Sequence, residues 1–348
     1  MKNSIITFLC CMVGFFFISC EEAVLGDEQS STARINFDLL WKDFDEHYAP
    51  FDARNVDWDE LYEQYSIRIT SETTNEELWT ISTELLENLK DRHINLVDTK
   101  NERSFKSGEA VADQAEEEFD LDLVKNKYLE AYQTFDEAGM SFGKIKDKAV
   151  GYIYLSEING EAPGVIDKVI AELKDAEAII VDIRNNGGGS DRFAHRVAGA
   201  FADGEHFIYT VQTKNGPGRD DFDEKKKWFA KPAGPEQFTK PVILLMDRFT
   251  LSAAEIFQLN MQAFGHVTTM GDFTGGSHSD VSSFRFLPNG WIYTLAPQLY
   301  LMPDGQSLEG IGIAPDEFVK NTKESIDMGN DLVMENAFEY LGEIYGIE

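Results

Sequence analysis

Apolar residues recur every three or four positions in the first part of the chain, which is the spacing of helices that bury one face. The first such stripe consists of Phe37, Leu40, Trp41 and Phe44. A second stripe runs through 58–65 and a third through 75–89, where Glu76 and Glu77 suit the positive end of a helix dipole. The pattern predicts a small helical domain over residues 34–100.

From residue 149 onward the pattern changes to short, continuous apolar runs that alternate with amphipathic segments. The runs 149–158, 178–183 and 242–246 predict buried strands, and the segments 165–173 and 193–201 predict helices. Further elements expected on the same grounds are strands at 266–270 and 291–295, a helix after Ser252 and a closing helix at 331–345. This alternation indicates βα units around a largely parallel sheet, so the predicted fold class is α/β.

The segment between these two regions is charged, with acidic residues gathered at 116–122. We interpret it as an acidic linker that carries one helix at about 122–135. The predicted organisation is a signal peptide (1–19), a tether (20–33), a helical domain (34–100), the acidic linker (101–147), an α/β core (148–320) and a C-terminal helix (321–348).

The first twenty residues have the layout of a bacterial secretory signal, with Lys2 followed by an almost wholly apolar stretch over 5–18. Ser19 and Cys20 end that stretch and resemble a lipobox, in which the cysteine receives the lipid; a plain hydrophobic anchor is the alternative. We therefore expect a lipoprotein of the bacterial cell envelope, attached through Cys20 to the outer membrane and facing either the periplasm or the surface. Cleavage before Cys20 would remove Cys10 and Cys11, which excludes thiolate chemistry from the mature chain.

Composition narrows the possible partners. The 62 acidic residues outnumber the 31 basic ones and give a net charge of −31. Because nucleic-acid affinity depends on cations that neutralise phosphates, we expect no nucleic-acid partner. Hydrophobic residues make up 43% of the chain, enough for a substantial core.

Ser252 is the first residue that could carry chemistry. It follows the apolar run 242–246 and opens a predicted helix. Serine is a favoured N-cap, so a purely structural role is one interpretation. The same position places a hydroxyl beside free backbone amides, which can stabilise an oxyanion in acyl transfer. The glycine turn 185–189 could supply another amide, or could be a simple βα connection or a phosphate site, although no P-loop lysine follows it.

A serine nucleophile needs a base, and spacing cannot choose one, because triad partners meet in space and not in sequence. A histidine of ordinary structural role is the alternative at each position. The six candidates are His47, His93, His195, His206, His266 and His278.

Four motifs narrow this choice. DRHINL, VDIRNNGGG, MDRFTLSAAE and LEGIGIAPD occur in that order between Asp91 and Asp316. Together they resemble the S41 serine peptidases, which include the carboxyl-terminal processing proteases and the tricorn core protease. The resemblance implies a core of stacked ββα units, similar to the Clp protease and crotonase fold, with an added helical domain.

The resemblance also implies roles for individual residues. Ser252 matches the nucleophile, and the amides of Gly188 and Ala253 match the oxyanion hole. His93 matches the base in the Ser-His branch of the family, and Glu309 matches the acid that supports it. No metal or organic cofactor is expected.

Three departures refine the expectation. Ser277 stands where the processing branch has its lysine base, which favours the histidine branch. Arg92 stands where the tricorn type has a serine that links the histidine to the glutamate. The interval 101–147 is too short for the PDZ module of many processing relatives, so capture of a free C-terminus is not expected.

The resulting hypothesis is a lipid-anchored serine endopeptidase that cleaves unfolded polypeptides by Ser-His acyl transfer. A catalytically inactive, S41-like peptide- or ligand-binding lipoprotein is the main alternative, and an acidic surface adhesin is a third. The sequence leaves the oligomeric state open.

Overall fold

The three helical stripes form α2 (Ala33–His47), α3 (Trp58–Ser66) and α4 (Asn75–Glu87) in the computed structural model, which describes residues 32–108, 116–160 and 162–347. Their N-termini are capped by the side chains of Thr32, Asp57 and Thr74. The expected signal peptide and Cys20 lie outside the described residues. Within the described ranges, no helix is long and apolar enough to cross a bilayer.

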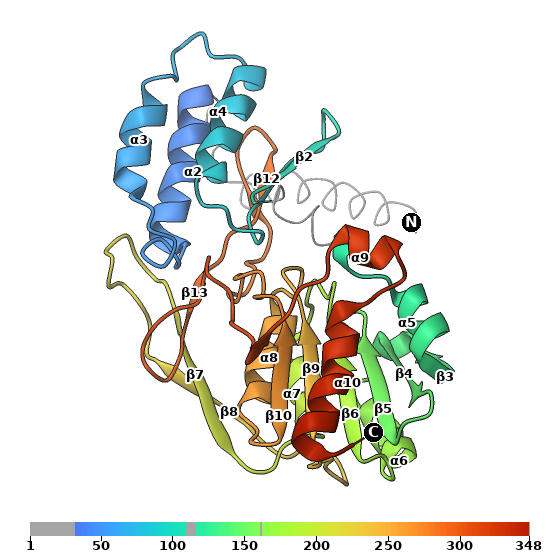
Figure 1. The fold of residues 1–348 in the computed structure, drawn as a ribbon. Helices are drawn as coiled ribbons and strands as arrows, with labels where there is room; N and C mark the ends of the chain where they lie inside the picture. The colour runs from blue at the N-terminus through green and yellow to red at the C-terminus, as the bar shows by residue number, and fades with distance from the viewer. Residues whose placement is uncertain (1–31, 109–115, 161, 348) are drawn as a thin grey trace, which may run out of the picture.

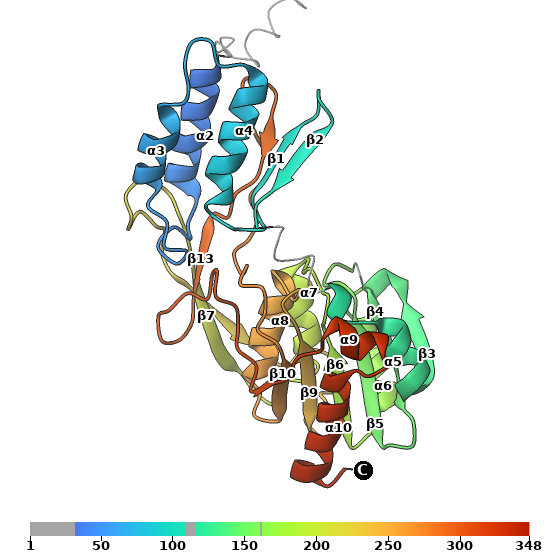
Figure 2. The same ribbon diagram turned by 45° about the horizontal axis from the view of Figure 1, so that its top comes forward.

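A small sheet completes the helical part. Its order is β11 (Arg285–Phe286), β12 (Ile292–Tyr293), β1 (Asn95–Asp98) and β2 (Arg103–Lys106). Trp291 and Leu295 of the late segment share a hydrophobic core with Phe37 and Leu85 of the helices. Residues near 290 therefore return to the amino-terminal part of the molecule, as Figures 1 and 2 show, instead of staying within the expected core at 148–320. A local apolar pattern predicts that a strand is buried but not which helices cover it.

The main sheet has seven strands and confirms the predicted α/β class. Its order is β14 (Glu317–Phe318), β10 (Val267–Gly271), β9 (Val242–Met246), β6 (Ala178–Asp182), β5 (Val150–Leu155), β4 (Met140–Ile145) and β3 (Leu129–Phe135). The first five strands in this order are parallel, and β4 and β3 continue the sheet antiparallel at one end.

Helices cover both faces of this sheet, as Figure 1 shows. Alternate residues of β9 enter two separate cores: Leu244 packs with one set of helices and Leu245 with the other. The first core contains α6 (Val165–Leu173), α7 (Asp191–Ala198) and α8 (Ala253–Gln262); the second contains α5 (Leu121–Tyr128) and α10 (Leu332–Tyr345). Burial on both faces explains why these strands are continuous apolar runs in the sequence.

The segment expected to be a linker is part of the sheet. The helix predicted at 122–135 ends at Tyr128 as α5, and the chain continues directly into β3 and then β4. β3 is an edge strand with mostly exposed side chains, so its polar composition resembles that of a linker. The short helix α9 (Lys323–Asp327) precedes α10.

A second small sheet forms an arm beside the helical part. It consists of β13 (Gln298–Leu301), β7 (His206–Thr213) and β8 (Lys226–Ala230), in that order. The backbone N–H of Ala49, after α2, donates to the carbonyl of Ala296, just before β13, at 2.9 Å. The loops around β13 thus connect the helical part to the core, and both views place them between the two (Figures 1 and 2).

Candidate active site

Two turns meet where the parallel strands β6 and β9 end. The Thr250 hydroxyl donates to the carbonyl of Ile183 at 3.1 Å, and the Leu251 N–H donates to the carbonyl of Asn186 at 3.0 Å. Carboxyl ends of adjacent parallel strands share one edge of a sheet, so the topology brings these loops together. The glycine turn is thereby fixed against the turn that leads to Ser252.

Asp247 adds a buried carboxyl to this junction. It accepts hydrogen bonds from the N–H groups of Asn185, at 3.0 Å, and Phe249, at 2.9 Å. Burial raises the pKa of Asp247 to about 7, and the charge of Arg184 and the amide hydrogen bonds oppose that rise only in part. The Asp247 side chain therefore bridges the two turns.

Ser252 has a backbone conformation that serine seldom adopts. Its φ is 54° and its ψ is −126°, directly before α8. Its N–H donates to the Ser277 carbonyl at 3.0 Å and to the Glu255 carboxylate at 3.1 Å, which hold the turn in place. Strained residues of this kind concentrate at functional sites, and a sharp strand-to-helix turn is the setting of many serine nucleophiles.

Gly188 packs directly against this turn. A Cβ atom built on Gly188 would lie 2.7 Å from the Leu251 carbonyl oxygen and 2.7 Å from the Ser252 Cβ, and its φ is +98°. Only glycine fits this contact. Ala253 occupies the first position of α8, where an amide has no acceptor within its own helix.

The two amides expected in the oxyanion hole therefore lie beside Ser252, but their hydrogen bonding differs. The Gly188 N–H donates to the side-chain oxygen of Asn186 at 2.9 Å. To bind an oxyanion, this amide would have to leave or share that acceptor. The oxyanion roles of Gly188 and Ala253 stay predictions.

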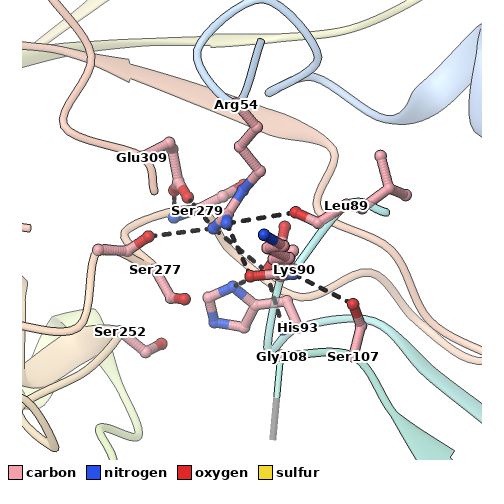
Figure 3. A network of polar contacts seen from close by, with 12 residues as sticks. Arg54, Leu89, Lys90, His93, Ser107, Gly108, Ser252, Ser277, Ser279 and Glu309 are labelled. Atoms are coloured by element: carbon pink, nitrogen blue, oxygen red, sulfur yellow. Dashed lines mark hydrogen bonds and ion pairs between the residues drawn. The ribbon is translucent and has the colours of Figure 1, made fainter. Parts of the chain in front are cut away.

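His93 comes from the segment between α4 and β1, far from Ser252 in the sequence. Figure 3 shows the Ser252 hydroxyl and the His93 imidazole pointing toward one another. The His93 Nδ1 lies 3.5 Å from an Asp91 carboxylate oxygen, which also accepts the His93 backbone N–H at 2.9 Å. The fold thus brings the predicted base and nucleophile into one site.

Charge keeps this histidine basic. Burial opposes protonation of His93, but the neighbouring carboxylates of Asp91 and Glu309 outweigh it and raise its pKa above the ordinary imidazole value. Asp91 is itself fully buried and accepts the Tyr48 hydroxyl at 2.9 Å. Although burial acts to raise the pKa of Asp91, nearby Arg54 and His93 hold it well below its usual value.

Glu309 occupies a different place from the one expected. Its carboxylate accepts the Ser279 N–H at 2.5 Å and binds Arg54 Nη2 at 2.8 Å. The carboxylate next to His93 is Asp91, and Glu309 reaches that pair through Arg54 (Figure 3). Burial, together with the charge of Asp91, raises the pKa of Glu309.

Three residues of this polar network were not predicted from the sequence. Asp91 lies two residues before His93 in the same motif, so its proximity could have been found. Tyr48 and Arg54 carry no local signal, because they reach the site through the packing of the helical part. The Arg92 guanidinium stacks over the Phe249 ring at 4.7 Å.

Three of the other candidate histidines contact groups other than Ser252. His195 contacts Asn260 and Tyr209, and the His206 ring pairs with Asp203. His278 is buried with its Nε2 3.5 Å from the Glu255 carboxylate. In the described ranges, no group of three or more His, Cys, Asp or Glu side chains is arranged to hold a metal ion.

Two family profiles match parts of the chain. The profile of peptidase family S41 matches residues 149–319, and that of the tricorn protease C1 domain matches 31–87. The carboxyl-terminal-processing protease of Picosynechococcus sp. is 29% identical over 172 residues, which are 49% of this chain and 39% of that relative. The chain thus spans well under half the length of this curated relative.

Solved structures extend the likeness to the whole described fold. A crystal structure described as that of a peptidase from Parabacteroides merdae superposes with a TM-score of 0.81 at 30% identity, covering 90% of this chain and 97% of the other. Mature CPAF bound to lactacystin has the same fold, with a TM-score of 0.68 at 11% identity over 89% and 98% of the two chains. On these matches, the chain belongs to peptidase family S41.

Proposed function

We propose that the chain is a serine endopeptidase of the histidine-base type. The observation that carries this proposal is the facing pair of Ser252 and His93. An Asp91 carboxylate oxygen lies 3.5 Å from the Nδ1 of His93. Family membership adds support, since the curated relatives are named as proteases.

In the proposed mechanism, His93 accepts the Ser252 proton while the hydroxyl oxygen attacks a peptide carbonyl carbon. Asp91 stabilises the imidazolium that forms, and His93 then gives the proton to the leaving amine. The amides of Ala253 and Gly188 stabilise the oxyanion, a contribution typically of about 2.7–4 kcal/mol per donor. Water hydrolyses the acyl-enzyme with the same base.

The substrate class we propose is unfolded polypeptide. β13 is an edge strand of its sheet, and its first residue, Gln298, accepts a hydrogen bond from Ser279 at 2.6 Å, next to Glu309. An extended segment could add to such an edge through backbone hydrogen bonds.

A second candidate is an inactive member of the family that binds peptides. The observation that favours it is the Gly188 N–H, which is engaged by Asn186 and would have to be freed for catalysis. Hydrolysis of unfolded casein separates the two: an active enzyme cleaves it, whereas an inactive binder does not, even in Asn186→Ala, where the Gly188 amide is freed.

The proposal is tested by hydrolysis of unfolded casein with the purified chain, Ser252→Ala and His93→Ala. We expect hydrolysis by the wild type and losses of about 10⁴-fold or more in both variants. Ser190→Ala, in the polar turn beyond the glycines, is a matched serine control that keeps activity. Hydrolysis that survives in Ser252→Ala would refute the assignment.

We further propose that the protein is a bacterial lipoprotein of the cell envelope, anchored through Cys20. Support comes from the sequence alone, in the apolar stretch that ends at Ser19 and Cys20. Labelling with a palmitate analogue should mark the wild type and not Cys20→Ala; equal labelling of both would contradict the anchor.

A further inference from the structure

Arg54 connects the two acidic side chains of the site and has no role in the mechanism above. It lies in the loop after α2, and only 5% of its side chain is exposed. Its Nη2 lies 2.8 Å from Glu309 and 3.7 Å from Asp91. The same residue therefore binds one carboxylate from the helical part and one from the core.

Backbone carbonyls fix the guanidinium in this position. Nη1 donates to the Lys90 carbonyl at 2.9 Å, directly before Asp91, and Nη2 donates to the Gly276 carbonyl at 3.0 Å, directly before Ser277. The arginine thus holds the base-bearing segment and the loop beside the nucleophile at once, as Figure 3 shows. A planar guanidinium suits this task, because its donors leave in fixed directions.

We propose that Arg54 is a positioning residue of the active site, which clamps Glu309 and Asp91 together and so sets the charge that His93 faces. The inference deepens the proposed peptidase function and rests on it. In this account Arg54 fixes Glu309 and Asp91 in place, and the charges of all three groups act on His93.

The sign of the effect follows from charge. The positive Arg54 acts to lower the pKa of His93, whereas Glu309 acts to raise it. A general base works unprotonated, so a higher pKa of His93 moves the acidic limb of kcat/KM to higher pH. Charged groups that face His93 come from several elements: Asp91, Arg54, Glu309, Asp280 and, at the start of α7, Asp191.

The test compares Arg54→Met, Glu309→Gln and the double variant, with Asp191 and Asp280 left in place. We expect Arg54→Met to move the acidic limb to higher pH by about one unit, and Glu309→Gln to move it to lower pH. The double variant should return toward the wild type, and Arg54→Lys should restore part of the Arg54→Met shift. Opposite shifts are not the result of a merely structural defect.

Arg103→Met is the control, because Arg103, on β2, is another arginine that pairs with two carboxylates, those of Glu76 and Asp98. It should leave the acidic limb unmoved. If Arg54→Met does not fold, Arg54→Lys and Glu309→Gln decide the matter, and their shifts should again be opposite in sign. Shifts of the same sign in both single variants, or no shift in either, would overturn the positioning role.

A readout that does not require turnover separates this inference from the proposed function. The pKa of the His93 imidazole is measured by NMR titration in the Ser252→Ala background, with His93→Gln identifying its signal. A chain without hydrolysis but with opposite shifts would refute the peptidase proposal and keep the clamp. Hydrolysis that depends on Ser252, without these shifts, would refute the clamp alone.

Discussion

Two buried arginines in this molecule each bind a pair of carboxylates, and only one of the two clusters contains a base. Arg184 binds Asp182 at 2.6 Å and Asp331 at 2.9 Å, and all three side chains are at most 1% exposed. The remaining acceptor capacity is met by neutral donors, the Tyr152 hydroxyl and the Asn321 amide. None of these partners is a histidine, so this cluster contains no general base.

The Arg54 cluster is built less tightly and has a titratable neighbour. Its distances are 2.8 Å to Glu309 and 3.7 Å to Asp91, and Asp91 also faces His93. Buried ion pairs are expensive to desolvate, so satisfied clusters act mainly in stability and specificity of packing. An arginine bound to two carboxylates thus stabilises the fold where every partner is fixed. It adjusts the pKa of a base where a neighbour of the cluster can take up a proton.

The largest expected effect is a loss of kcat when a carboxylate of the Arg54 cluster is neutralised. Asp91→Asn removes the carboxylate behind His93 and should lower kcat by about 10³–10⁴-fold, because the imidazolium loses its stabilisation. Asp182→Asn makes the same chemical change in the other cluster and should leave kcat of the folded protein close to that of the wild type. Steady-state hydrolysis of a peptide substrate measures both; equal losses of kcat would erase the distinction.

For the free energy of unfolding, we expect the larger effect in the Arg184 cluster. Arg184→Met leaves Asp182 and Asp331 buried without their cation and should cost about 3–5 kcal/mol in the free energy of unfolding. Arg184 acts to hold the pKa of Asp331 below its usual value despite burial, so that contribution is present above about pH 4 and is lost as pH falls further. Urea unfolding at pH 7 and pH 3 measures the cost, which should shrink at pH 3. A cost that grows in acid would contradict this account.

The glycine contact at the nucleophile offers a local test. Gly188→Ala places a methyl group against Leu251 and Ser252 and should lower kcat by about 10²-fold or more, through displacement of the oxyanion turn. Gly305→Ala is the control, because Gly305 has a similar φ of +86° with nothing within 4 Å of the added methyl. Both substitutions strain the backbone, so a kcat loss common to both would trace the effect to φ alone.

The smallest expected effect concerns a more distant charge. Asp280 lies within electrostatic reach of His93, and burial raises the pKa of Asp280. Asp280→Asn removes a negative charge and should shift the acidic limb of kcat/KM slightly to lower pH, because the imidazolium is less favoured. Arg54→Met shifts the limb the other way and by more. A larger shift in Asp280→Asn would place control of the base outside the Arg54 cluster.

Much of the fold followed from local pattern, because the strands and helices of the core bury continuous or periodic apolar residues. The runs at 178–183 and 242–246 became β6 and β9, and the segment 165–173 became α6. The helix predicted at 122–135 is correct over its first half, which is α5, and wrong over its second half, which is strand β3, since an exposed edge strand has no apolar stripe.

Only part of the candidate site was predicted from the sequence. Ser252 and His93 were identified through motifs, and the structure brings them together. The partner of His93 was not identified, because the acid was expected to be Glu309, whereas Asp91 makes the contact. Arg54 could not be predicted, since its contact with Glu309 depends on how the helical part sits against the core.

The central claim is that His93 activates the Ser252 hydroxyl. A fluorophosphonate probe reacts covalently with an activated serine, and peptide mass spectrometry locates the adduct. We expect one adduct at Ser252 in the wild type and almost none in His93→Ala. An adduct that forms at Ser252 equally fast in both proteins, or at another serine only, would contradict it.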